Sequence, residues 1–191
     1  RFFRTPSSIG PEVWLNSNSA KKYFASFDAS ISFKGMFNGR SHFLYVGNRY
    51  RFNDRLSVSL DVSFNDSKNE PGFADLDADA VIFSRRNRNT FDNNLGIKYN
   101  FNKNTGIVLN VRHYWSNVKA KQFYTLKEDG GLINNSTYAG NVDYNVNIFT
   151  VDMVFSWQFA PGSFMYIVWK NNTQYFEQAN SYFVNLNKTL G

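Results

Sequence analysis

Three aspartates at alternate positions are the clearest candidates for metal binding in this 191-residue chain. Asp75, Asp77 and Asp79 offer carboxylate oxygens, the ligands that Ca²⁺ prefers, and Asp66 and Glu70 lie nearby in the sequence. The glycine and the bidentate glutamate of a calcium-binding loop are missing at the expected spacing. We therefore expect a solvated acidic loop here, with a calcium site as the alternative.

Catalytic chemistry has little support in the sequence. The chain has no cysteine, which excludes thiolate nucleophiles, cysteine metal sites and disulfides. His42 and His113 have no serine or carboxylate at a spacing typical of a triad, so both are expected to be structural. The net charge of +6 is spread along the chain, as on a solvated polar face. We predict no enzymatic activity, no cofactor and no nucleic-acid partner.

A period of two predicts the elements that carry these residues. Between positions 23 and 37 every odd residue is apolar or glycine and most even residues are polar, and the alternation returns between positions 56 and 64. Globular strands average about 5 to 6 residues, whereas a strand that crosses a membrane needs about 9 to 11. We therefore predict an all-β protein, an antiparallel up-and-down transmembrane β-barrel.

Composition agrees with this fold class. A mean hydropathy of −0.44 and the absence of any run of 18 or more apolar residues exclude a helical membrane protein. The aromatic content of 18% suits a barrel, which collects aromatic residues at the two membrane interfaces. Residues 1–191 are predicted to form a single domain.

About eight strands are predicted, joined by four short turns and by polar loops over residues 66–78 and 127–141. Residues 1–11 are expected to be a loop. The strands are expected over residues 12–17, 23–37, 42–52, 56–65, 95–101 with a polar extension from 85, 107–121, 147–159 and 163–175. Short turns are typical of the periplasmic side of an outer-membrane barrel and long loops of the outer side.

Loop parity predicts the register. All apolar faces share one side of the sheet only if each short loop has an odd number of residues. Three-residue loops pair Phe52 with Leu56, Phe101 with Thr105, Phe159 with Ser163, and Ser17 with Lys21. In such loops Asn104 and Gly162 suit a last position with positive φ. Because the first strand runs toward the short turns and the last runs away from them, at least one further strand is expected at each end, with residues 178–191 outside.

Two groups of charged residues follow from this register. A basic group beside the aromatic pair Phe91 and Trp115 is predicted to contact outer-leaflet lipid phosphates, or else to be a solvated strand extension: Arg85, Arg86, Arg88, Lys119 and Lys121. A polar network on the lumen face is predicted either to fill a narrow barrel or to line a pore: Asp28, Arg49, Arg51, Asp61, Lys98, Arg112 and Asp152.

On the outward face, Asn48 and Asn93 are predicted to mark a protein contact or a bulge. Ile31 is predicted to lie near the bilayer midplane.

Three stretches carry a resemblance to a known family. They are Arg4-Thr5-Pro6 followed by Trp14-Leu15-Asn16, then RFNDRLSVSL over residues 51–60 and FAPGSFMYIVW over residues 159–169. They resemble outer-membrane proteins of unknown function typical of Bacteroidota, in which a carbohydrate-binding-like β-sandwich precedes a C-terminal barrel. The resemblance implies a bacterial outer-membrane location and a barrel architecture. It implies no active site, and it suggests polysaccharide only by analogy.

These patterns favour a non-enzymatic outer-membrane barrel that acts as an anchor or a channel, in contact with outer-leaflet glycolipid and other outer-membrane proteins. The resemblance suggests a glycan-handling complex. The alternative from another class is a soluble β-sandwich that binds glycans, which the strand length and the ten-residue spacing of outward aromatics such as Phe91 and Phe101 oppose. An outer-membrane enzyme with a site in its loops is a third reading, for which no Ser, His and carboxylate constellation is present.

Overall fold

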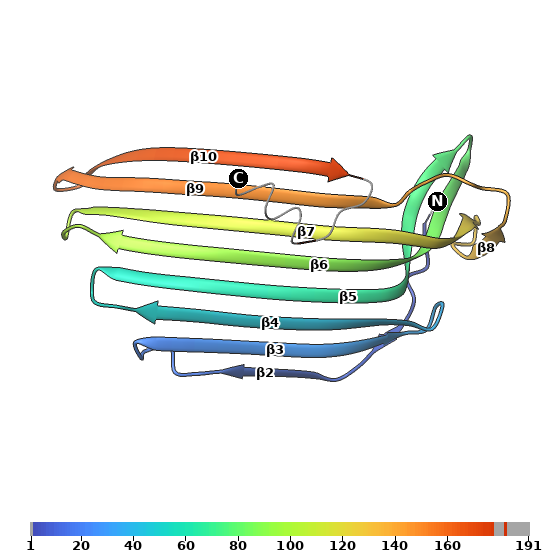
Figure 1. The fold of residues 1–191 in the computed structure, drawn as a ribbon, viewed down its shortest axis with the longest axis horizontal. Helices are drawn as coiled ribbons and strands as arrows, with labels where there is room; N and C mark the ends of the chain where they lie inside the picture. Colours follow the sequence, from blue (N-terminus) through green and yellow to red (C-terminus); the bar gives the residue numbers. More distant parts are fainter. Residues whose placement is uncertain (1, 178–181, 183–191) are drawn as a thin grey trace.

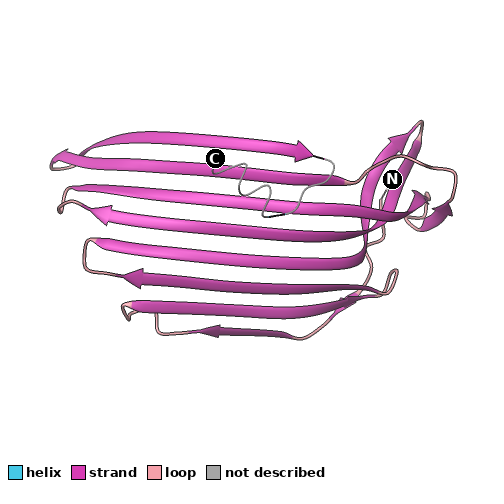
Figure 2. Ribbon diagram, viewed as in Figure 1, coloured by secondary structure: helices cyan, strands magenta, loops and turns pink. Residues whose placement is uncertain are grey.

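The computed structural model describes residues 2–177 and 182, and the strands in it form one antiparallel sheet (Figures 1 and 2). The strands are β1 (Ser8–Ile9), β2 (Glu12–Asn16), β3 (Tyr23–Lys34), β4 (Gly39–Arg51), β5 (Leu56–Asp77), β6 (Ala80–Asn100), β7 (Thr105–Leu126), β8 (Leu132–Asn135), β9 (Tyr144–Ala160) and β10 (Ser163–Glu177). Among these residues no helix is long and apolar enough to cross a membrane. The all-β antiparallel prediction is confirmed.

The strand order is β1-β3-β4-β5-β6-β7-β9-β10, with β2 also paired to β3 and β8 to β7. The eight long strands are those expected from the sequence. The segment 1–11, expected to be a loop, contributes β1, which extends the β2 edge beyond Gly10 and Pro11. Within the described residues nothing pairs with the outer edges of β2 and β10, so the sheet is open. The prediction that residues 178–191 lie outside the membrane concerns a segment outside the described residues, apart from Tyr182.

The register separates the two faces as loop parity predicts. Leu60 pairs with Leu95, Leu95 with Val111, and Val111 with Val151, so apolar residues continue across β5, β6, β7 and β9. Asp61, the next residue along β5, pairs with Asn94 on the opposite face. A shift of one residue in any hairpin would have exchanged these faces. We call them the outer (apolar) face and the inner (polar) face.

The turns confirm two of the four predicted pairings. Phe52 N–H donates to Leu56 O and Phe101 N–H to Thr105 O, each at 2.9 Å. In the last turn Gly162 has a φ of 77°, as predicted. The register shifts beside Ser163, which pairs with Ala160, so Phe159 is not its direct partner.

Two further turn predictions are wrong. Ser17 N–H donates to Ala25 O, not across a three-residue loop to Lys21. The connection is longer because Lys21 N–H donates to Asn18 O and forms a tight turn inside it. An odd loop is still kept, so the faces do not change. Asn104 is not left-handed; its N–H donates to the Asn102 side chain at 2.8 Å, an Asx turn that needs no positive φ.

The predicted long loops are largely strand. The range 66–78 belongs to β5, which runs to Asp77 and pairs with β6 through register shifts after Ser67 and Phe73. These shifts erase the period of two in the sequence, because an inserted residue moves the following side chains to the opposite face. In Figure 1 this end of the β5–β6 hairpin bends away from the other strands. The range 127–141 likewise contains β8, which pairs with β7.

The small buried core lies at the end of the sheet that carries the long hairpins. Ile82, Val118 and Leu126 are at most 6% exposed. The N-terminal segment closes over this end, since Phe3 stacks on Phe83 with ring centroids 4.7 Å apart and Arg4 N–H donates to Gly130 O at 3.0 Å. The opposite end carries the short turns (Figure 2). One end of the sheet therefore carries the long hairpins and the other the short turns, as the predicted lengths of the connections require.

Gly47 tests the packing of the inner face. The Tyr45 hydroxyl passes over Gly47 and donates to Asp61 at 2.9 Å, so a Cβ at this buried position would meet both side chains. We expect Gly47→Ala to lower the free energy of unfolding by about 1 to 3 kcal/mol, measured by urea denaturation with tryptophan fluorescence. Gly96→Ala is the control, because its Cβ meets the end of a flexible serine side chain. Equal losses in both variants would contradict the steric argument.

Candidate functional site

The inner face holds the seven residues predicted as a polar network. Strand alternation and the observed register place all of them there: Asp28, Arg49, Arg51, Asp61, Lys98, Arg112 and Asp152. They do not form one continuous network. Each of several charges has a local partner, and most of these partners were not named from the sequence.

A bidentate inner-face pair joins Arg112 and Asp92. Arg112 Nε donates to Asp92 Oδ1 at 2.9 Å and Nη2 to Oδ2 at 2.5 Å, the bidentate fork that suits guanidinium and carboxylate. Lys170 Nζ lies 3.7 Å from Asp152 Oδ1. Strand parity places Asp92 on the inner face of β6, so alternation could have found this partner.

Arg49 and Arg51 bind a backbone group instead of a carboxylate. Both donate to Ser19 O, from Nη2 atoms at 2.8 Å and 2.5 Å. The Arg49 guanidinium also lies over the Phe24 ring, 5.3 Å from its centroid. The β2–β3 turn is thereby fixed over the inner face at the short-turn end, a contact that no sequence pattern indicated.

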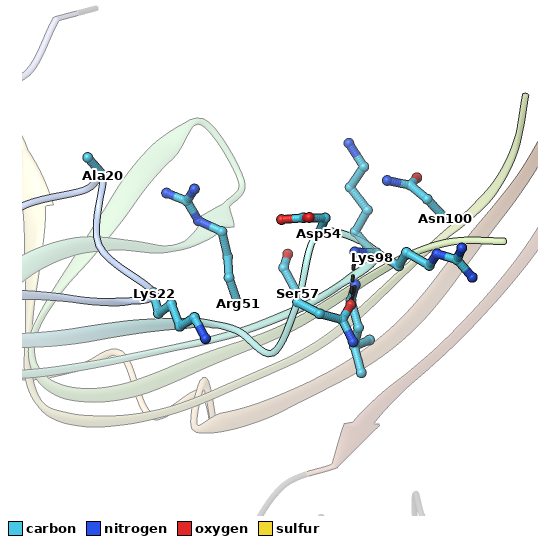
Figure 3. Close-up of a pocket in the computed structure, with 10 residues that line it drawn as sticks. Ala20, Lys22, Arg51, Asp54, Ser57, Lys98 and Asn100 are labelled. Carbon is cyan, nitrogen blue, oxygen red and sulfur yellow. Dashed lines mark hydrogen bonds between the residues drawn. The ribbon is translucent and has the colours of Figure 1, made fainter. Parts of the chain in front are cut away.

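A basic pocket opens at this short-turn end. Its volume is about 370 Å³. It is lined by Ala20, Lys22, Arg51, Asn53, Asp54, Arg55, Leu56, Ser57, Lys98 and Asn100. In Figure 3 Arg51, Ser57 and Lys98 rise from neighbouring strands on the same side of the sheet. The lining carries four cationic side chains and one carboxylate, so it suits an anion.

The structure divides the predicted lipid-phosphate group between both faces. Arg86 and Arg88 lie on the inner face, where Arg86 Nε donates to Glu70 Oε1 and Arg88 Nη2 to Glu70 Oε2, both at 3.1 Å. Glu70 is 4% exposed, and the Arg86 guanidinium packs over Gly72. Lys34 Nζ is 4.0 Å from the same carboxylate.

The remaining three cations of that group differ in position. Lys121 is the bulged residue of β7 and donates to Asn69 Oδ1 at 3.2 Å. Arg85 and Lys119 share the outer face with Phe91 and Trp115 by strand alternation. A contact with lipid phosphate therefore stays a prediction that, by geometry, best suits Arg85 and Lys119.

The three aspartates of the predicted calcium site do not converge. Among the described residues no group of three or more His, Cys, Asp or Glu side chains is placed to hold a metal ion. Asp75 instead accepts from the Tyr138 hydroxyl at 2.7 Å and from Leu76 N–H at 2.8 Å. These bonds lower the pKa of Asp75, and the bond to Asp75 raises the pKa of Tyr138 to about 12.

The outer face has polar interruptions that are satisfied within the chain. Asn48 accepts from the Tyr23 hydroxyl at 2.5 Å, and Asn93 donates to the Tyr182 hydroxyl at 2.8 Å. No register shift occurs at either position, which excludes the predicted bulge. His113, 4% exposed, binds Asn147 Oδ1 through Nε2 at 2.7 Å and faces the Tyr182 ring at 5.4 Å.

Glu70 is expected to be essential for the stability of the long-hairpin end. Glu70→Gln removes the carboxylate from two arginines and should lower the free energy of unfolding by about 3 kcal/mol, the low end for a broken buried pair because Arg88 is partly exposed. Urea denaturation measures the loss. Lys127→Gln, which breaks the exposed pair with Asp129, should change little. A loss no larger than that of this control would contradict a buried ionic cluster.

The Tyr138 and Asp75 contact predicts a shifted phenol titration. A raised pKa in the folded state means that the hydrogen bond is fully present below the ordinary value of 10.0 and is lost as pH rises through about 12. An ultraviolet difference titration of wild type against Tyr138→Phe isolates this phenol. Asp75→Asn should return its pKa toward 10.0. The same Tyr138 titration midpoint in the wild type and in Asp75→Asn would exclude the contact in solution.

Comparison with known proteins identifies the family and leaves its activity open. No curated protein and no solved structure matches the chain at a significant level. One family model matches residues 1–191, the whole chain. Its description is Domain of unknown function (DUF5916). Because the match covers the whole chain, the chain belongs to this family.

Proposed function

We propose that this chain forms part of the wall of a bacterial outer-membrane β-barrel, as a non-enzymatic anchor or channel. The outer face contacts lipid and the inner face lines the lumen. The short turns lie in the periplasm and the long hairpins outside the cell. Contacts with outer-leaflet glycolipid and other outer-membrane proteins belong to the proposal. The link to glycan handling rests only on the family resemblance described above.

The uncovered outer face is the observation that carries this proposal. Large apolar side chains on it are more than a third exposed: Val13, Leu15, Phe27, Leu44, Val46, Leu60, Trp157, Phe159, Met165 and Ile167. Soluble proteins rarely leave so extended an apolar surface in water. A soluble β-sandwich would cover it with a second sheet, but every described strand belongs to one sheet. Lipid is therefore the environment that best suits this face.

The apolar band also crosses the strands obliquely. On β3 the apolar band spans residues 23–33, and its middle is residue 28. Strand pairing connects residue 28 through residues 45, 63, 92 and 114 to residue 148 on β9. The band on β9 spans residues 149–159. The middle of the band on β9 is residue 154, six positions beyond residue 148. Six residues rise about 20 Å, and five strand spacings cover about 24 Å, so the band is inclined by about 40°. Barrel strands tilt by about 35 to 45° to the membrane normal.

Aromatic residues mark the borders of this band. At its long-hairpin border Phe64 and Phe91 lie with ring centroids 4.6 Å apart, and Phe91 and Trp115 6.0 Å apart. At the short-turn border Trp157 contacts Phe159 at 5.8 Å. Aromatic side chains favour the interface between hydrocarbon and water. Two such borders support a membrane-spanning band between them.

Barrel closure would solve the problem of the open edges. In hydrocarbon an unpaired backbone group costs several kcal/mol, so β2 and β10 need further strands beside them. Those strands belong to the proposal, whether supplied by the same protein or by a partner. Only a closed wall would separate a polar lumen from lipid.

Arginine substitution at two depths tests the membrane proposal. Leu60 lies at the centre of the band on β5, and Ile31 lies inside the band on β3, three positions from its middle at residue 28. Phe33 lies at the long-hairpin border of the band on β3. We expect Leu60→Arg and Ile31→Arg each to cost about 2 to 4 kcal/mol in lipid vesicles and Phe33→Arg about 1 or less. Reversible urea unfolding of the protein refolded into vesicles measures these costs.

The matched control is on the inner face. Ser59→Arg, next to Leu60 in sequence, points away from the lipid by strand alternation and should cost much less than Leu60→Arg. Equal costs for Leu60→Arg and Phe33→Arg, or folding in water without detergent or lipid, would overturn the proposal. Gel migration that changes on heating would support a folded barrel.

A further inference from the structure

The basic pocket differs from the rest of the inner face in its charge balance. Elsewhere on that face Arg112 pairs with Asp92, Lys170 with Asp152, and Arg86 and Arg88 with Glu70. In the pocket, the cationic groups have no carboxylate within 4.0 Å among the described residues. These groups are Lys22, Arg51, Arg55 and Lys98, and the lining includes one carboxylate, Asp54. An excess of three positive charges is left without a carboxylate partner, although Arg51 also donates to Ser19 O.

The register brings three of these cations to one level. Lys22 O accepts from Arg51 N–H at 2.8 Å, Arg51 pairs with Ser57, and Ser57 pairs with Lys98. These three cations and Ser57 therefore form a row from the start of β3 to β6, in which adjacent strands lie about 4.8 Å apart. A small anion in the pocket could meet two or more of them. Like charges this close repel each other, and an anion between them would remove that repulsion.

The donors suit an oxyanion. The Arg51 guanidinium carries several N–H groups in a planar fork, the lysine ammonium groups are point charges, and the Ser57 hydroxyl can donate between them. The cavity of about 370 Å³ is at the lower end of the range for small-molecule sites, about 300 to 1,000 Å³. It can hold a phosphate group or a carboxylate group with part of the molecule that carries it.

We propose that this pocket binds a small oxyanion, either a phosphate or a carboxylate, at the short-turn end of the inner face. Arg51 and Lys98 supply the main contacts, and Lys22, Arg55 and Ser57 complete the site. The site goes beyond the proposed wall function, because its geometry lies within β3 to β6 and does not depend on insertion into a membrane. In a barrel it would lie at the periplasmic mouth of the lumen.

Direct binding to the purified, folded chain tests the site. Calorimetric titration with inorganic phosphate and, separately, with glucuronate measures Kd and distinguishes the two sources. Binding of either probe supports the site, and the tighter probe identifies its chemistry. Arg51→Gln and Lys98→Gln should each weaken that binding by about tenfold or more, because each removes a charge-assisted contact. Binding should also weaken as sodium chloride is raised.

Lys170→Gln is the matched control, since it removes a lysine from the same face at a residue paired with Asp152 and outside the pocket. Its Kd should stay within about twofold of the wild type. Circular dichroism and gel migration on heating establish that each variant folds, and these readouts also test the barrel separately. No binding of either probe to the folded wild type would overturn the site. Equal weakening by Lys170→Gln and the pocket variants would overturn it as well, because it would mean a general charge effect.

Discussion

A one-layer sheet with an apolar face must bury that face against something outside itself. In a sandwich or a helix-covered sheet the chain supplies the second layer, and the stability of the protein comes from the area removed from water. Here the described strands form a single layer, and Phe27, Val46 and Leu60 on its outer face stay substantially exposed. The hydrogen-bond ladder alone cannot compensate for this exposed apolar surface, because water satisfies the same backbone groups in the unfolded chain. The identity of the missing layer is thus the central question for function, and the oblique course of the apolar band favours lipid over a flat protein surface.

Most of the sheet could be predicted because two independent signals agree. The period of two assigns each side chain to a face, and the odd loops keep that assignment from one strand to the next. Val111 was therefore placed beside Leu95 by parity alone, and the register confirms it. The signal fails where the chain leaves the apolar band: residues 66–78 pair as strand, yet the register shifts beside Ser67 and Phe73 break the alternation there. A loop and a bulged strand look alike in a sequence when neither face has a uniform environment.

The candidate sites were harder to predict because they depend on contacts between distant segments. Alternation assigned Arg49 and Arg51 to the inner face, but not their shared acceptor, Ser19 O in a turn about 30 positions away. Glu70 looked like a loop carboxylate, and only the extension of β5 places it between Arg86 and Arg88. Composition counts six excess positive charges without locating them. Carboxylates pair with Arg86, Arg88, Arg112 and Lys170 on the inner face, whereas the cations of the pocket at the short-turn end have no carboxylate partner among the described residues, so the charge asymmetry is a property of the fold.

The outer face is not uniform either, and its polar positions are grouped. Asn93 on β6, His113 on β7 and Asn147 on β9 lie in adjacent rows, and each has a partner: Asn93 binds the Tyr182 hydroxyl and His113 binds Asn147. The Tyr182 ring also contacts Phe91 at 4.6 Å and Trp115 at 5.8 Å, so this residue covers the place where the face is most polar. On β4 the polar residue Asn48 is satisfied by Tyr23 from the next strand. A polar amide in hydrocarbon costs little once its hydrogen bonds are made locally. In the proposed barrel the outer face would therefore meet lipid over β3 to β5, and the Tyr182 side chain would cover the polar group on β6 to β9.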